Sequence, residues 1–493
     1  MLQFIRHDRS TVEARTSQRN RHASRTHQSR CRDCQRGGRW AASCHSRSGH
    51  QWHRGAHGCH GHDPVYTTGY AHMSALIFEN IRILSPGSAL NGANRIGIDQ
   101  GVFVDPDSLP EAPRIDGGNQ LLIPGLIDLR THLREPGLEH KGSIASETRA
   151  AVAGGITTVV STPNTDPLVD SPADVRLVLE RALYSGLCRV LPTALLTQGG
   201  SGTHLSEMAA LRDAGCVALT QGDQPFQSRK VQFNALNYAK SLGIPVILNA
   251  ESRDFAGGCA HAGRIATGLG LPLNSPLSEI LGMGVDLELV EASGARVHFS
   301  RLTTARAVDK LRDAKARGLP VTGDVSLAHL IFNETALEDL DPVFHLQRPL
   351  RTETDRQALL AGVVDGTIDA IVTDHSPHEP GAKLAPFPET DTGMSLIEVT
   401  LNLLLKLQSP EAGLDELLAA MTSRPAQIIE QTDLGSINYG KTADCVLFDP
   451  EGRRSPETTT WHSAGQNSPF FDQTLPGRIV GVWIDGQSVD AHA

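Results

Sequence analysis

Short runs rich in β-branched and apolar residues, each followed by a segment with helical periodicity, fill the middle of this 493-residue chain. Such an alternation is typical of parallel βα units. Eight of these strands make a closed barrel the economical arrangement, so we predict an α/β fold of the (β/α)8 TIM-barrel type, with its chemistry at the carboxyl ends of the strands. The predicted strands are 125–129, 157–161, 189–194, 218–220, 246–249, 296–299, 321–325 and 370–373.

The two ends of the body have a different sequence pattern from the barrel. Short β segments separated by Gly, Pro and Asp occupy 76–84, 96–98, 101–104 and 120–123, and the same pattern returns at 444–450 and 477–486. We therefore predict a small β-sandwich-like satellite domain built from residues 73–123 and 436–493. The barrel itself is predicted to span residues 124–435.

The first 72 residues differ in composition from the rest of the chain. They hold twelve Arg, no Lys and four acidic residues, or about +8, which leaves about −18 for the remainder. Cys31, Cys34, Cys44 and Cys59, among several histidines, allow a zinc knuckle on a basic arm that binds nucleic acid. The segment has almost no apolar residues to close a core, so we expect residues 1–72 to be a disordered or non-native extension, with the body starting near Met73.

The composition of the remainder bears on compartment and partners. An acidic body is a poor nucleic-acid binder, so no nucleic-acid partner is expected. No apolar run approaches the roughly 20 residues of a membrane span, and the start does not resemble a signal peptide. The remaining cysteines lie singly in apolar stretches, which suits a reducing cytosol. We expect a cytoplasmic protein with no membrane partner.

Several separate sequence blocks resemble the dihydroorotase branch of the amidohydrolase superfamily. They are Asp128-x-x-x-His-Leu-Arg-Glu-Pro-Gly137, Ala153-Gly-Gly-Ile-Thr-Thr-Val159, Thr162-Pro-Asn-Thr165 and Val372-Thr-Asp-His-Ser-Pro-His378, in the order of the family and near its spacing. Arg134, inside the first block, favours dihydroorotase over allantoinase and dihydropyrimidinase. The resemblance covers the chain from about Met73 onward and implies the barrel fold, but by itself it does not imply activity.

The resemblance also implies a set of zinc ligands. Active members hold one or two zinc ions with His-x-His on the first strand, a bridging carboxylate, two further histidines and an aspartate on the last strand. The metal makes hydroxide near neutral pH, and the aspartate shuttles the proton. Aligned with that pattern, this chain keeps the second histidine as His132 and the aspartate as Asp374. A structural histidine of the family is kept as His298.

The other four of the six ligand positions are lost in this alignment. Arg130 replaces the first histidine, and Arg301 aligns with a later one. Gln221 aligns with the bridging carboxylate, and Asn249 with the remaining histidine. A guanidinium keeps its proton, has no lone pair to give and repels a dication. We therefore expect no metal or other cofactor, and only vestigial roles for the two retained ligands.

Two hypotheses describe what occupies the former metal site. In the first, Arg130 or Arg301 fills the vacated volume and pairs with Asp374, because an unpaired buried carboxylate would cost several kcal/mol. In the second, Asp223 replaces the lost carboxylate, since a shift of two residues in an extended segment returns a side chain to the same face. Together with His132 and Asp374 it would form a weak mononuclear zinc site.

Part of a substrate site is also implied by the resemblance. Arg134 corresponds to the residue that binds the carboxylate of dihydroorotate, and Asn164 to its amide-reading neighbour. A family asparagine near a Pro-Pro-Leu-Arg turn aligns with Gln347. A purely structural role for an arginine at a strand end is the competing interpretation once the metal is gone.

Three functions are compatible with the sequence. The first is a non-catalytic dihydroorotase-like protein of pyrimidine biosynthesis, which the resemblance associates with the catalytic chain of aspartate carbamoyltransferase in a hetero-oligomer. The second is an active dihydroorotase or related cyclic amidohydrolase with an altered or single-zinc site. The third is a nucleic-acid-binding protein that uses the basic arm. The lost ligands favour the first, in which the barrel is kept as a structural subunit.

Overall fold

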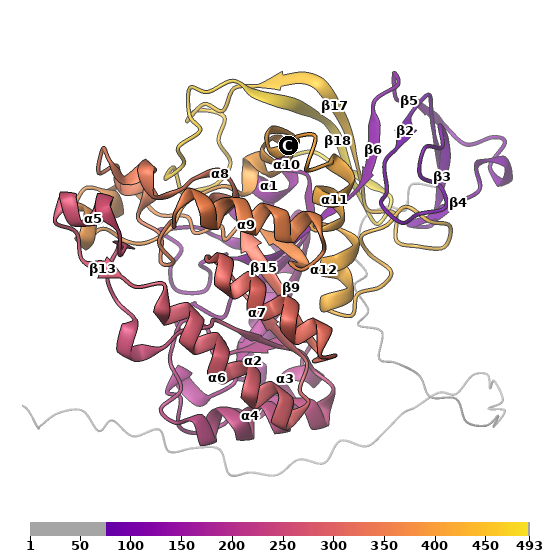
Figure 1. Cartoon of the computed structure of the whole chain (residues 1–493). Helices are drawn as coiled ribbons and strands as arrows, with labels where there is room; N and C mark the ends of the chain where they lie inside the picture. The colour runs from indigo at the N-terminus through magenta and orange to yellow at the C-terminus, as the bar shows by residue number, and fades with distance from the viewer. Residues whose placement is uncertain (1–74, 492–493) are drawn as a thin grey trace, which may run out of the picture. The chain divides into compact units, whose positions relative to one another are not determined.

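Eight parallel strands form the centre of the protein in a computed structural model that describes residues 75–491 (Figure 1). Hydrogen bonds join them in chain order, and a bridge between Thr131 and His375 closes the ring between the first and the last strand. The predicted barrel and its eight strands are thereby confirmed. They are β7 (Leu126–Thr131), β8 (Ile156–Ser161), β9 (Arg189–Leu195), β10 (Ala218–Thr220), β11 (Val246–Leu248), β14 (Val297–Phe299), β15 (Val321–Ser326) and β16 (Ala370–Val372).

Helices follow the strands and cover the outside of the barrel, and polar caps fix where many of them begin. Ser143 and Ser171 form capping boxes with the residues three positions on, which satisfies backbone N–H groups that have no partner inside a helix. The helices are α1 (Ile144–Ala153), α2 (Pro172–Ser185), α3 (Met208–Asp213), α4 (Arg229–Leu242), α5 (Arg264–Leu269), α6 (Leu277–Ser293), α7 (Ala305–Ala316), α8 (Leu327–Ile331), α9 (Glu353–Val364), α10 (Thr400–Leu407), α11 (Leu414–Ala419) and α12 (Ser423–Ile428).

The β-rich ends of the body form two further sheets. The first sheet has the order β4-β3-β1-β5 and the second β19-β18-β17-β6-β2, while β12 (Ala260–His261) and β13 (Leu273–Asn274) pair separately. Strand β6 pairs antiparallel with β17, so both ends of the body share one sheet. The strands are β1 (Leu76–Glu79), β2 (Arg82–Ile83), β3 (Ile96–Asp99), β4 (Val102–Val104), β5 (Arg114–Asp116), β6 (Leu121–Pro124), β17 (Cys445–Arg454), β18 (Leu475–Ile484) and β19 (Gln487–Val489).

The shared sheet separates two apolar cores. Successive side chains of a strand point to opposite faces. On β17, Val446 and Phe448 belong to the large core of the barrel, whereas Cys445 and Leu447 belong to a smaller core with residues of β1 and β3. The domain boundaries at 123/124 and 435/436 stay a prediction, because this sheet contributes to both cores.

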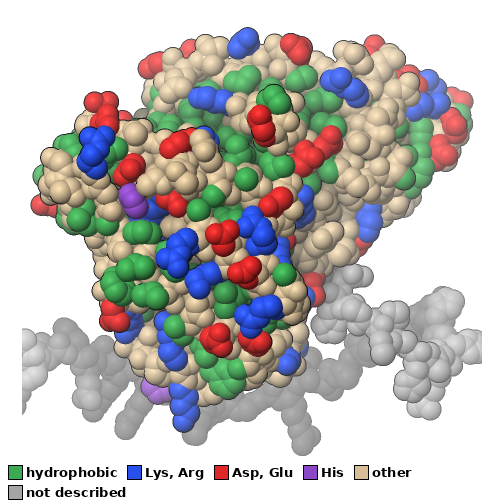
Figure 2. Space-filling view, in the orientation of Figure 1, with side chains coloured by type: hydrophobic (Ala, Val, Ile, Leu, Met, Phe, Trp, Pro, Cys, Tyr) green, Lys and Arg blue, Asp and Glu red, His purple; other side chains and the backbone are tan. Residues whose placement is uncertain are grey.

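One face of the protein carries exposed apolar side chains among mixed charges (Figure 2). Leu277, Leu281 and Val285 follow one another at helical spacing on α6, and about two fifths of each is exposed. No helix among residues 75–491 is long and apolar enough to cross a membrane. The predictions made for residues 1–72, and the start near Met73, lie outside the described residues.

The smaller core allows a test of the packing between the first and the last strands of the body. Phe78 is fully buried, and its ring meets Trp483 edge to face at a centroid distance of 4.7 Å. We expect Phe78→Ala to lower the free energy of unfolding by about 3–5 kcal/mol, because it removes an aromatic side chain and leaves a cavity. Urea denaturation measures the change. The control is Val480→Ala on β18, where the side chain is 47% exposed and the effect should stay below about 0.5 kcal/mol. Equal effects would contradict the packing.

Candidate functional site at the mouth of the barrel

The ends of five barrel strands bring the predicted site residues together. Arg130 lies on β7, and the other residues follow β10, β11, β14 and β16: Asp223, Asn249, Arg301 and Asp374. Because the carboxyl ends of parallel strands meet at one face of a barrel, residues far apart in sequence become neighbours there. The result is a single polar cluster.

Two arginines and two aspartates form the centre of this cluster. Nε of Arg130 donates a hydrogen bond to Oδ1 of Asp374 at 2.7 Å, and Nη2 of Arg301 donates to Oδ1 of Asp223 at 2.6 Å. Cross contacts connect the two pairs. Nη2 of Arg130 lies 3.4 Å from Asp223, and Nη1 of Arg301 lies 3.7 Å from Asp374. The hypothesis that an arginine pairs with Asp374 is confirmed.

The arginine side chains of the cluster are buried, so their charges act strongly on the neighbouring aspartates. The side chain of Arg301 is only 1% exposed and that of Arg130 6%. Burial alone would raise the pKa of Asp223, but the positive charges of Arg301 and Arg130 outweigh it and hold that pKa well below its ordinary value. The four groups together carry no net formal charge. The charges of the cluster therefore balance without an added ion.

Amide side chains complete the hydrogen bonding of Asp223. Nδ2 of Asn249 donates to Oδ1 of Asp223 at 3.0 Å, and Nδ2 of Asn164 donates to Oδ2 at 2.8 Å. Gln347 accepts a hydrogen bond from Nη1 of Arg301 at 2.8 Å. Gln221 instead bonds to Thr197 and to the carbonyl of Gly200. Among these residues it is thus Asp223, two positions along the chain, that supplies the carboxylate at the centre.

The residues present do not fit the zinc centre implied by the resemblance. Two ligand positions in the alignment hold guanidinium groups, which cannot coordinate a metal ion. Between residues 75 and 491, no group of three or more His, Cys, Asp or Glu side chains is placed to hold a metal. His132 contacts the hydroxyl of Thr162 at 3.0 Å through Nδ1. Burial and the charges of Arg134 and Arg130 lower its pKa well below the ordinary value, so it stays neutral.

The predicted substrate-binding residues are engaged by the protein itself. Arg134 is buried, and its guanidinium donates to the carbonyl of Pro377 and to the hydroxyl of Ser376, and it contacts Nε2 of His378 at 3.1 Å. Asn164 is committed to Asp223. Their role in binding a substrate stays a prediction.

Three residues of the site have unusual backbone conformations. Arg134, Arg301 and Asp374 have φ angles of +66°, +59° and +48°. These lie in the left-handed region, which costs side-chain-bearing residues about 1 kcal/mol or more and is concentrated at functional sites. Asp324 supports one of them, since its carboxylate accepts the backbone N–H of Arg301 at 2.6 Å and also contacts His298 at 2.8 Å.

A second buried network lies beside the cluster, and sequence analysis missed it. Nε2 of His375 contacts Glu147 of α1 at 2.6 Å, and both side chains are fully buried. The same carboxylate accepts a hydrogen bond from Ser463, which lies between β17 and β18. Glu147 sits in an ordinary helical pattern and is far from its partners in sequence, so no local signal marks it.

The fold of the described residues matches that of solved hydantoinases and dihydropyrimidinases. Solved structures with the same fold include an L-hydantoinase (dihydropyrimidinase) from Arthrobacter aurescens, with a TM-score of 0.75 at 20% identity over 84% of this chain and 96% of that one. A dihydropyrimidinase from Brevibacillus agri gives 0.73 at 21% identity, over 84% and 94%. At these identities the likeness concerns the fold alone.

Sequence comparison then identifies the family. Residues 119–306 match the family described as dihydro-orotase-like. A dihydroorotase-like protein from Pseudomonas aeruginosa is 42% identical over 82% of this chain and 97% of its own length, and a dihydroorotase from Geobacter sp. is 35% identical over 84% and 99%. The chain belongs to the dihydroorotase-like family.

The ion-pair cluster can be tested through stability. We expect Arg130→Met to lower the free energy of unfolding by about 3–5 kcal/mol, because it leaves the partly buried Asp374 without its closest positive charge. Adding Asp374→Asn should recover part of that loss, since the double variant no longer carries the uncompensated charge. Guanidinium denaturation of the single and double variants measures the coupling.

The control for that cycle is Arg312→Met on α7, where an exposed arginine pairs with exposed aspartates. Its effect should stay below about 1 kcal/mol. An Arg130→Met variant as stable as the parent protein would show that the pairing carries no stability.

Proposed function

We propose that this chain is a catalytically inactive dihydroorotase-like protein, which serves pyrimidine biosynthesis in the cytoplasm as a structural subunit. The observation that carries the proposal is the pairing of Arg130 and Arg301 with Asp374 and Asp223. Hydrolysis of a cyclic amide near neutral pH requires an activated water and a base to move its proton. In the alignment implied by the resemblance, these two guanidinium groups take the positions of zinc ligands.

The loss extends to the proton-transfer group. Oδ1 of Asp374 accepts the hydrogen bond of Arg130 and faces Arg301 at 3.7 Å. Both arginines thus engage the carboxylate that would have to accept the proton. In the proposed role Asp374 is a charge partner that holds the mouth of the barrel together. His132 forms its hydrogen bond with Thr162, and burial and the charges of Arg134 and Arg130 outweigh the effect of Asp223 and lower its pKa.

The proposed partner is the catalytic chain of aspartate carbamoyltransferase, in a hetero-oligomer. Support comes from the resemblance of the chain to non-catalytic dihydroorotase-like proteins that assemble with this enzyme. The names of the two Pseudomonas relatives, at 42% and 39% identity, are also "Dihydroorotase-like protein" and not "Dihydroorotase". A structural role requires the fold of the barrel but does not require its metal ligands.

Metal analysis and an activity assay test the inactivity. We expect the purified chain to contain no stoichiometric zinc and to show no ring opening of dihydroorotate or closure of carbamoyl aspartate, with or without added zinc. Elemental analysis by mass spectrometry and a chromatographic assay give the two readouts. Stoichiometric zinc together with turnover would instead establish the alternative, an active cyclic amidohydrolase with an altered or mononuclear site.

A reversal variant provides the matched positive control. Arg130→His, Asn249→His and Arg301→His, made together, restore imidazole at three aligned positions while keeping His132, Asp223 and Asp374. We expect this triple variant to bind zinc, because neutral imidazoles and carboxylates replace the guanidinium groups as neighbours. Elemental analysis of the folded variant and of the parent protein makes the comparison. A triple variant as free of zinc as the parent would contradict the ligand alignment.

Affinity purification tests the partner. A tagged chain expressed in its own cells should retain aspartate carbamoyltransferase through size-exclusion chromatography, in a complex larger than either protein. The triple reversal variant should retain it as well, since the substituted residues lie inside the barrel mouth. A chain that runs as a monomer at physiological concentration, without the carbamoyltransferase, would contradict the structural role.

A further inference from the structure

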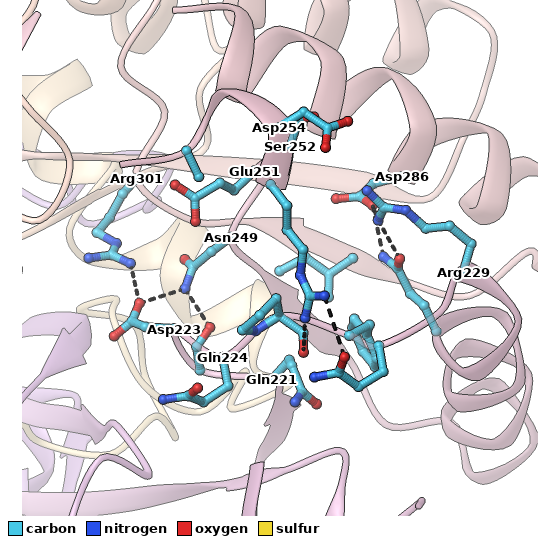
Figure 3. A pocket seen from close by; sticks show the side chains of 18 of the residues that line it. Gln221, Asp223, Gln224, Arg229, Asn249, Glu251, Ser252, Asp254, Asp286 and Arg301 are labelled. Carbon is cyan, nitrogen blue, oxygen red and sulfur yellow. Dashed lines mark hydrogen bonds and ion pairs between the residues drawn. The ribbon is translucent and has the colours of Figure 1, made fainter. Parts of the chain in front are cut away.

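A cavity of about 450 Å³ lies beside the ion-pair cluster, between the loop after β10 and the end of β11 (Figure 3). This volume is within the range of small-molecule sites in proteins. Amide, hydroxyl and charged side chains line most of it. In Figure 3, Asp223, Asn249 and Glu251 lie on one side of the cavity, and Asp286 and Arg229 lie on the opposite side.

Half of the charged side chains around the cavity form ion pairs inside the protein. Arg229 meets Asp286 at 3.0 Å, and Arg301 meets Asp223 at 2.6 Å. Arg348 is the exception among the buried ones, since only 6% of it is exposed and none of the described residues places a carboxylate within 4.0 Å of it. It donates one hydrogen bond, from Nη1 to the carbonyl of Ala250 at 2.8 Å. Its remaining N–H groups have no partner among residues 75–491.

A guanidinium without an ion-pair partner can bind an anion from a ligand. Burial and the nearby charge of Arg301 lower the pKa of Arg348, and the charges of Glu251, Glu279 and Asp223 oppose this shift only in part. Planar guanidinium groups bind carboxylates through two parallel hydrogen bonds. The side chain therefore offers a charged anchor for a carboxylate inside the cavity.

The cavity also offers a hydrogen-bond acceptor, on the amide of Asn249. Nδ2 of Asn249 donates to two acceptors, the carbonyl of Gly222 at 2.8 Å and Oδ1 of Asp223 at 3.0 Å, and these bonds fix the orientation of the amide. Oδ1 of Asn249 is consequently turned away from them, and it is buried with no hydrogen-bond partner in the described part of the chain. A buried acceptor of this kind calls for a donor from a ligand.

Two exposed carboxylates extend this acceptor side. Glu251 and Asp254 line the same cavity, and neither forms an ion pair with another residue of the described range. The four arginines and four acidic residues of the lining leave it with no net formal charge. A phosphate dianion would add two negative charges beside Asp223 and Glu251, whereas a zwitterion adds none. The unsatisfied groups thus match a carboxylate and an ammonium carried by one molecule.

We propose that this cavity binds a small α-amino acid as its zwitterion, with the carboxylate on Arg348 and the ammonium facing Asn249 and Glu251. The cavity shares Asp223, Asn249 and Arg301 with the ion-pair cluster, but its anchor Arg348 is distinct from Arg134, which contacts Ser376 and Pro377. The inference does not depend on whether the chain is inactive, because no catalytic group takes part.

Calorimetry of the full chain with the common L-amino acids, one at a time, tests the proposal. We expect saturable binding of at least one of them, and binding weaker by about tenfold or more in Arg348→Gln, which removes the positive charge while keeping a hydrogen-bonding side chain. Arg312→Gln on α7 is the matched control, because it makes the same change of net charge on the surface away from the cavity. Its affinity should equal that of the parent protein.

A second variant keeps the test sharp if Arg348→Gln does not fold. Glu251 is exposed, so Glu251→Gln should fold, and it should weaken binding of the amino acid but not of the same molecule without its amino group. No saturable binding of any common amino acid at millimolar concentration, equal affinity in Arg348→Gln, or tighter binding of inorganic phosphate would each overturn the proposal. A loss of binding in Arg312→Gln equal to that in Arg348→Gln would overturn it too.

Discussion

Two carboxylates held close together at the mouth of an α/β barrel need positive charge between them. In this chain Arg130 and Arg301 supply it, and each arginine contacts both Asp223 and Asp374. Because the four residues come from different strand ends, their pairing ties β7, the loop after β10, and the residues that follow β14 and β16 into one unit. Asn164, Asn249 and Gln347 form hydrogen bonds with residues of that unit. Compensation of buried charge therefore stabilises the mouth of the barrel.

The backbone of the mouth has a feature that is concentrated at functional sites. Arg134, Arg301 and Asp374 have left-handed conformations, and the hydrogen bond from the backbone N–H of Arg301 to Asp324 supports one of them. The chain is 35% identical to a protein named dihydroorotase, and in the alignment implied by the resemblance it carries guanidinium groups at two ligand positions.

Sequence patterns predicted the barrel well because strand and helix signals in βα units are local. Each predicted strand lies within one or two residues of an observed one, and the pairing of an arginine with Asp374 followed from charge alone. Contacts between distant segments were harder. Gln221 bonds to Thr197, whereas Asp223 occupies the centre of the cluster. Which of the two side chains reaches the centre depends on the conformation of a glycine-containing loop. Nothing near Glu147 in the sequence indicates its buried contact with His375, and the unpaired state of Arg348 depends on what the whole barrel places around it.

The sheet shared by the two ends of the body has a consequence for synthesis of the protein. Strand β6 leads directly into β7, the first strand of the barrel, but its neighbour β17 follows only after the last helix of the barrel. On the ribosome, β6 therefore lacks this partner until the whole barrel has been synthesised. Completion of this fold is a late event, and a nascent chain truncated before β17 would expose edges that invite aggregation.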